Sequence, residues 1–111
     1  MNSLTPKRKH GPEWYIQQDI IAYLRMREWL VKPTHGNKFQ SGFPDLFATN
    51  AKYGPRWIEV KNADSYKFQP SQLEWFPQFC AHGSGVWVLV AATEAEYKKL
   101  LQPYNWWQYI K

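Results

Sequence analysis

The chain of 111 residues contains little cysteine and little histidine. With one cysteine, Cys80, it cannot form an internal disulfide, and one cysteine with three histidines gives no zinc-binding pattern. The longest strongly apolar run, residues 86–92, is far too short to cross a bilayer. The sequence therefore excludes a disulfide scaffold and a cysteine–histidine zinc module, and it predicts no contact with a membrane.

Repeats, low-complexity blocks and linker-like stretches are also missing, and a chain of this length is large enough for one core only. We expect a flexible basic arm at residues 1–11 and a single domain at residues 12–111 that includes an aromatic tail. The N-terminus lacks the apolar segment of a secretory signal, so we expect a cytoplasmic protein of a bacterial or phage-infected cell.

Acidic residues are the minority, with 9 Asp and Glu against 14 Lys and Arg. This balance favours a polyanionic partner, although a merely basic protein would show it too. The basic side chains, and one neighbouring amide, that we expect to contact nucleic acid are Lys7, Arg8, Lys9, Gln17, His35, Lys38 and Lys67. For His35 and Lys67 an ordinary solvated surface position is the alternative.

Two short motifs stand on strand-like runs: Gly-Phe-Pro-Asp at residues 42–45 and Trp-Ile-Glu-Val-Lys at residues 57–61. Side chains alternate along a strand, so Glu59 and Lys61 share one face while Ile58 and Val60 enter a core on the other. The turn-rich residues 49–55 predict a hairpin that brings Asp45 close to Glu59.

Two carboxylates in one cleft repel each other unless a cation lies between them. Hard oxygen ligands select Mg²⁺, with Mn²⁺ as a substitute, and Lys61 would face the metal-bound water or a scissile phosphate. The alternative is that Glu59 and Lys61 form the solvated face of an ordinary strand and that Pro44-Asp45 is an ordinary turn.

A first helix is predicted from about Pro12 to Val31, since Gly11-Pro12 is typical of a helix start and Lys32-Pro33 of a helix end. Glu13 extends the apolar stripe of this helix toward the sheet. It either belongs to the acidic site or simply suits the positive end of the helix dipole.

A second helix is predicted from about Pro70 to His82, with Gln72 at the polar end of its core-facing stripe. It begins either with Pro70 as its first residue or with a capping box of Ser71 and Glu74. Pro77 should kink or shorten it. Residues 86–92 predict a central buried strand, and Thr93 with Glu96 predicts a third helix that stops before Pro103.

The tail, residues 104–110, is rich in aromatic residues, and the chain has seven tryptophans. Such a tail can be a surface for a protein partner, a last strand packed over the sheet, or a base-stacking surface.

Glu13, the motif at residues 42–45, the Glu-Val-Lys at residues 59–61 and Gln72 together resemble the PD-(D/E)xK nuclease superfamily. The likeness is closest to its VRR-NUC branch, which resembles Holliday junction resolvases, and it covers residues 13–92. The resemblance implies an α/β fold of the restriction-endonuclease type: a central mixed sheet flanked by helices, in the order α-β-β-β-α-β.

The resemblance also implies site roles. Asp45, Glu59 and the Val60 carbonyl would bind Mg²⁺, with Glu13 binding directly or through water. Lys61 would orient the nucleophilic water and offset charge on the phosphorane, and Gln72 would hold water or the lysine. No small-molecule cofactor is expected.

The activity so implied is metal-dependent cleavage of DNA, branched as a four-way junction or flap, in phage or plasmid recombination or repair. We expect a homodimer that places two active sites on one DNA. The alternatives are a restriction-type duplex nuclease, a DNA-binding accessory protein with the same fold, and a protein interaction module that uses the aromatic face.

Overall fold

The computed structural model describes residues 10–34 and 41–110. Its elements are α1 (Pro12–Arg25), β1 (Leu30–Pro33), β2 (Leu46–Asn50), β3 (Gly54–Val60), α2 (Pro70–Ala81), β4 (Val86–Leu89), α3 (Glu94–Lys99) and the 3-10 helix η2 (Trp106–Tyr109). The predicted α/β class and the order α-β-β-β-α-β are confirmed. Among these residues no helix is long and apolar enough to span a membrane.

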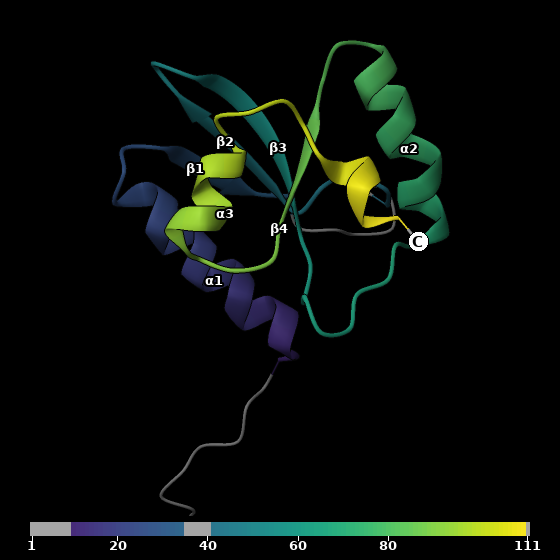
Figure 1. Ribbon diagram of the computed structural model, residues 1–111, viewed down its shortest axis with the longest axis horizontal. Helices are drawn as coiled ribbons and strands as arrows, with labels where there is room; N and C mark the ends of the chain where they lie inside the picture. Colours follow the sequence, from purple (N-terminus) through teal and green to yellow (C-terminus); the bar gives the residue numbers. More distant parts are fainter. Residues whose placement is uncertain (1–9, 35–40, 111) are drawn as a thin grey trace, which may run out of the picture.

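The four strands form one mixed sheet in the order β1-β2-β3-β4 (Figure 1). Strands β1, β2 and β3 pair antiparallel as a meander, and β4 pairs parallel to β3. The hairpin of β2 and β3 is the one that the turn at residues 49–55 predicts.

Strand β4 is buried, as predicted, but it lies at the edge of the sheet described here and not at its centre. The side chain of Asn105 occupies the place of a further strand. Its Oδ1 accepts a hydrogen bond from the Val88 N–H at 2.7 Å, and its Nδ2 donates to the Val88 carbonyl at 3.3 Å. An exposed edge would pair with other chains, and this side chain satisfies the edge locally.

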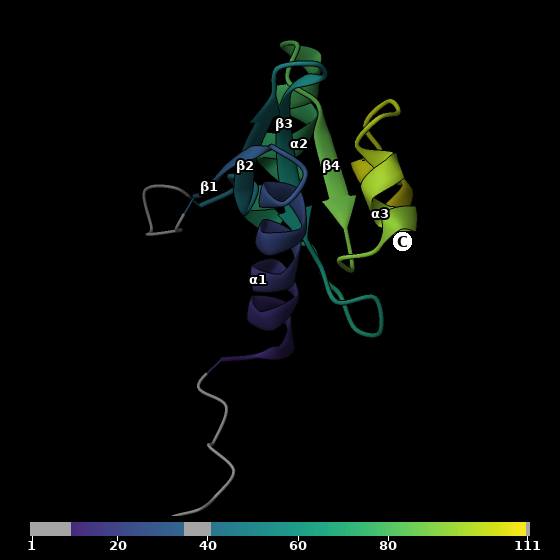
Figure 2. The same ribbon diagram turned by 90° about the vertical axis from the view of Figure 1, so that its left-hand side faces the viewer.

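Helices cover both faces of the sheet, and Figure 2 shows α1 in front of it and α2 behind. Residues from α1, α3 and one side of the strands form the larger core, which includes Ile20, Leu24, Ile58, Val60 and Leu100. The second core lies on the other face, between the sheet, α2 and η2, and contains Phe68, Phe76, Val86, Val88 and Trp106.

The predicted first helix to Val31 is too long, because α1 ends at Arg25 and Val31 lies in β1. Glu28 adopts a left-handed conformation with φ 67°. The Trp29 N–H donates to the Leu24 carbonyl and the Glu28 N–H to the Arg25 carbonyl, which is the Schellman pattern of a helix end. Since this pattern usually has glycine where Glu28 stands, the sequence carries no stop signal there.

Helix α2 starts with Pro70 at its first position, so the first of the two predicted starts is the correct one, and it continues through Pro77. Thr93 caps α3 by accepting from the Glu96 N–H, as predicted. The tail is not a strand. It forms η2, whose Trp106 is buried against Phe76.

Candidate active site

Asp45 and Glu59 meet because β2 and β3 pair with Leu46 opposite Ile58, which places Asp45 opposite Glu59 just before β2. The Val60 N–H donates to Asp45 Oδ2 at 2.8 Å and fixes this carboxylate. On the other side, the Thr34 N–H donates to the Asp45 carbonyl at 2.8 Å, and the Thr34 hydroxyl donates to the Pro44 carbonyl. The end of β1 thus holds the Pro-Asp motif in register.

Glu59 is 1% exposed, although it carries a carboxylate. Its Oε2 accepts a hydrogen bond from Gln72 Nε2 at 2.7 Å and lies 3.2 Å from Lys61 Nζ. Its Oε1 is also buried and has no hydrogen-bond partner among the described residues. A buried oxygen of this kind is costly unless some group compensates it.

Lys61 is 3% exposed and is held by three acceptors. Its Nζ donates to the Lys67 carbonyl at 2.8 Å and to Gln72 Oε1 at 3.1 Å, and Glu59 Oε2 is the third partner. The ring of Phe68 lies 4.7 Å from the ammonium nitrogen, which adds a cation–π contact. Because an ammonium group has three donors, the protein occupies all of them in this state.

Gln72 connects these groups with the first turn of α2. Its Oε1 accepts from Lys61 and also from the Gln69 N–H at 2.9 Å, while its Nε2 donates to Glu59. Since an amide offers a donor and an acceptor at once, Gln72 can orient a cation and an anion together. Gln72 thus caps the start of α2 and also contacts Lys61 and Glu59, while its role in catalysis stays a prediction.

The two carboxyl groups resist ionisation. Burial raises the pKa of Glu59 from its ordinary 4.5 to about 8, and the charge of Asp45 adds to the rise while Lys61 opposes it. Burial also raises the pKa of Asp45 to about 6. The Val60 N–H opposes that rise, and the charge of Glu13 adds to it.

Glu13 is half buried in the first turn of α1 and acts on Asp45 through its charge. No group of three or more histidine, cysteine, aspartate or glutamate side chains that could share one metal ion is present in residues 10–34 and 41–110. The geometry therefore brings together Asp45 and Glu59 as a pair, with Glu13 outside it. Direct binding of the ion by Glu13 stays a prediction.

The pair fits the Mg²⁺ or Mn²⁺ that the sequence predicts. Both groups are hard oxygen donors, and in this buried place the charge of Asp45 disfavours ionisation of Glu59. The unpartnered Glu59 Oε1 is a free ligand atom, and a cation would relieve both the repulsion and the missing partner.

The model of the VRR-NUC domain family matches residues 16–108, most of the chain. The chain belongs to the VRR-NUC family. A solved structure described as a VRR_NUC domain is similar, with a TM-score of 0.66, 24% sequence identity, and coverage of 83% of this chain and 97% of that one. At this identity the likeness shows the fold alone. Among curated proteins the comparison finds no match. The chain is thus a nuclease domain of the predicted superfamily.

Of the seven residues predicted to contact DNA, only Gln17 and Lys67 lie in the described part of this VRR-NUC domain. Lys7, Arg8, Lys9, His35 and Lys38 lie outside the described residues, so their roles stay predictions. Gln17 is half buried on α1, one turn after Glu13.

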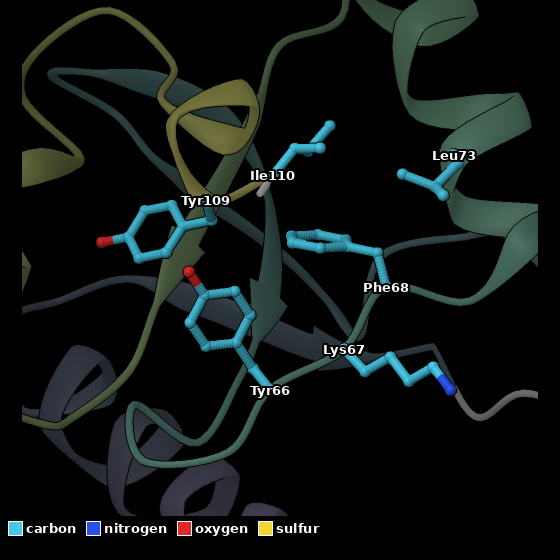
Figure 3. Close-up of a pocket in the computed structure, with 6 residues that line it drawn as sticks. All are labelled: Tyr66, Lys67, Phe68, Leu73, Tyr109 and Ile110. Atoms are coloured by element: carbon cyan, nitrogen blue, oxygen red, sulfur yellow. The ribbon is translucent and has the colours of Figure 1, made fainter.

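Lys67 is exposed. Its backbone lines a pocket of ≈ 230 Å³, and its side chain points away from that pocket, as Figure 3 shows. The other lining residues are Tyr66, Phe68, Leu73, Tyr109 and Ile110. Contact of Lys67 with DNA is compatible with this position and stays a prediction.

Four residues of the VRR-NUC site escape the sequence motifs. Thr34 fixes the Pro-Asp motif, Gln69 and the Lys67 carbonyl hold the groups around Lys61, and Phe68 covers its ammonium group. Backbone atoms make most of these contacts, so the residue type at these positions does not indicate a site role. Phe68 lies two residues before Pro70, the first residue of α2, and no motif marks this position.

Proposed function

We propose that the protein is a metal-dependent endonuclease that hydrolyses DNA phosphodiester bonds. The observation that carries this proposal is the buried pair of Asp45 and Glu59, with one free carboxylate oxygen, beside a lysine on the same strand face. Membership of the VRR-NUC family supports it, and the formal net charge of +5 suits a polyanionic substrate.

Asp45, Glu59 and the Val60 carbonyl would hold Mg²⁺, and Mn²⁺ would substitute for it. A bound divalent ion supplies a Lewis acid for the phosphate and lowers the pKa of a water ligand. The Val60 N–H keeps Asp45 in place through its hydrogen bond, and Gln72 keeps Glu59 in place.

Lys61 would contact the attacking water and the phosphate. To do so it must release one of its three partners, and the longest contact is the 3.2 Å contact with Glu59. Metal binding would also weaken this contact, because the cation would compensate the charge of Glu59 in place of the Lys61 ammonium group. The Lys67 carbonyl and Gln72 would then retain the ammonium group and aim its third donor at the substrate.

We further propose that the substrate is branched DNA, a four-way junction or a flap, cut during recombination or repair in a phage or plasmid setting. A homodimer would place two sites on one such molecule. The resemblance to junction-cutting nucleases supports this choice, and duplex cleavage of the restriction type is the enzymatic alternative.

The test is cleavage of labelled linear duplex, flap and four-way-junction DNA with Mg²⁺, Mn²⁺ or EDTA. We expect cleavage with either metal and none with EDTA, and the preferred DNA defines the substrate class. Asp45→Ala should lose both metal binding and cleavage, because it removes a ligand. Metal-independent cleavage, or full cleavage in this variant, would contradict the proposal. Binding of DNA without cleavage under every metal would favour an accessory protein.

A further inference from the structure

On the α2 face of the sheet, α2 and η2 contact mainly β4. Among the described residues, exposed side chains of β1 form an open surface at the other end of this face. Leu30 is 69% exposed there, and Lys32 is exposed. Lys32 pairs directly with Phe47 of β2, so the two side chains stand next to each other on this open surface.

A continuous row of five aromatic rings, here called the aromatic ladder, crosses from the open surface to α2. It consists of Phe47, Trp57, Phe43, Phe79 and Trp75. Successive ring centroids are 5.0, 5.9, 5.4 and 6.0 Å apart in that order. Each ring therefore contacts the next.

The ladder is accessible, because Phe43 and Trp75 are each 42% exposed and the other three rings are half buried. Ser41, Phe43, Trp75 and Phe79 line a hollow of ≈ 300 Å³. Trp75 lies directly over Gly42, where a Cβ atom would come within 2.6 Å of its ring. The position of Trp75 thus depends on the glycine of the Gly-Phe-Pro-Asp motif.

Two rings of the ladder share a strand face with the carboxylates. Phe47 stands two residues after Asp45 and Trp57 stands two residues before Glu59, and side chains alternate along a strand, so these two rings flank the carboxylate pair. Phe43 precedes β2 and contacts Trp57. A strand whose phosphate lies at Asp45 and Glu59 would bring its neighbouring bases against the rings.

We propose that the aromatic ladder is a stacking surface for unpaired nucleobases next to the phosphodiester that is cut. This inference rests on the proposed function, since it takes DNA as the substrate, and it adds that the substrate has an unpaired segment at the site. The flat π-faces of Phe43, Phe47 and Trp75 accept any base, and Lys32 at the open end attracts the backbone phosphates.

The positive charge of this surface favours nucleic acid over a second copy of the chain as its partner. A second copy of the chain would bring its own Lys32 and its own net charge of +5 against the same face, and nothing in the described part of the ladder offers an acidic partner to Lys32. A DNA strand supplies flat rings and negative charge together.

The experiment compares the binding of two labelled single strands in EDTA, where no cleavage occurs. One is a short oligothymidylate, and the other is an abasic strand of equal length that keeps the phosphates. Fluorescence anisotropy should show the base-containing strand binding about tenfold more tightly, as expected for one stacked base. Phe43→Leu combined with Phe47→Leu should remove this preference without weakening binding of the abasic strand.

The matched controls either keep the aromatic rings of the ladder or remove an aromatic ring outside the ladder. Phe43→Tyr with Phe47→Tyr should retain the preference, and so should Trp107→Leu, which removes a 58% exposed ring from η2. Trp75→Leu should weaken the preference by itself and serves if the double variant does not fold. Equal binding of both strands by the wild type, or an unchanged preference in folded ladder variants, would overturn the proposal.

The outcome is separable from that of the proposed function. Metal-dependent cleavage without any base preference would overturn the stacking surface and leave the nuclease proposal standing. A base preference in a protein that cuts no DNA would support the stacking surface and contradict the nuclease proposal. A wild-type dimer that becomes a monomer in the double variant, with the base preference unchanged, would show that the ladder is an interface between copies and overturn the proposal.

Discussion

The two faces of the sheet differ in what they bury, although alternate residues of one strand supply both. Toward α1, Ile58 and Val60 of β3 join an apolar core, while toward α2 Glu59 and the following Lys61 are equally buried. On the first face, Ile58 and Val60 gain free energy by removing apolar surface from water. The second face also holds an apolar core, but beside it Asp45 and Glu59 are two carboxyl groups with raised pKa values in a poorly solvated position. The stable face thus supports the reactive one.

The largest expected effect is on catalysis. Lys61→Met should lower the cleavage rate by about 10²–10³-fold, as expected when a donor to the transition state is removed. Metal binding should persist, because Lys61 is not a ligand. The measurement is single-turnover cleavage with Mg²⁺. Lys98→Met is the matched control, since Lys98 is exposed on α3 and has no predicted role at the site or in DNA contact. Full activity in Lys61→Met would remove the lysine from the mechanism.

On the apolar face, Ile58→Ala should lower the free energy of unfolding by about 2–5 kcal/mol, the usual range for a fully buried aliphatic side chain. Ile58 is 0% exposed in the larger core. Urea unfolding measures this loss. The folded fraction should still bind Mn²⁺ with unchanged affinity, and a loss of affinity in folded protein would show that the two faces are not independent.

At the sheet edge, Asn105→Ala should cost about 1–3 kcal/mol, because the Val88 N–H and carbonyl both lose their partner in a buried place. Asn105→Asp keeps the acceptor and loses the donor, so thermal unfolding should place it between the alanine variant and the wild type. Equal stability of all three proteins would contradict the edge-capping role.

The last expected effect concerns the pH dependence of stability. Both acids have a folded-state pKa above the ordinary values of 3.8 and 4.5, so the folded protein binds protons more tightly than the unfolded chain. In metal-free buffer the stability should therefore fall as pH rises from about 4 to about 8. Glu59→Gln should flatten this dependence, and added Mg²⁺ should reduce it in the wild type. A stability that rises over this range would contradict the assigned shifts.

The sequence predicts the polar positions better than the ends of the elements. Alternation along residues 57–61 is enough to place Glu59 and Lys61 on one face, and the turn-rich residues after β2 are enough to bring Asp45 to Glu59. Local periodicity encodes both features.

The wrong predictions concern features that tertiary contacts determine. Val31 follows Leu24 by seven residues, a spacing that suits a helix face, yet a left-handed Glu28 ends the helix between them. Strand β4 resembles a central strand because Asn105, far away in the sequence, covers its edge. The contacts of Lys61 with a backbone carbonyl and with Phe68 are likewise invisible to a motif.

The central claim is that Asp45 and Glu59 form a cation site, and calorimetric titration of the DNA-free protein with Mn²⁺ tests it most directly. We expect saturable binding in the wild type, loss of that binding in Glu59→Gln, and no change in Glu74→Gln, which alters an exposed acid of α2. Equal binding in Glu59→Gln and the wild type would contradict the account and place the metal elsewhere.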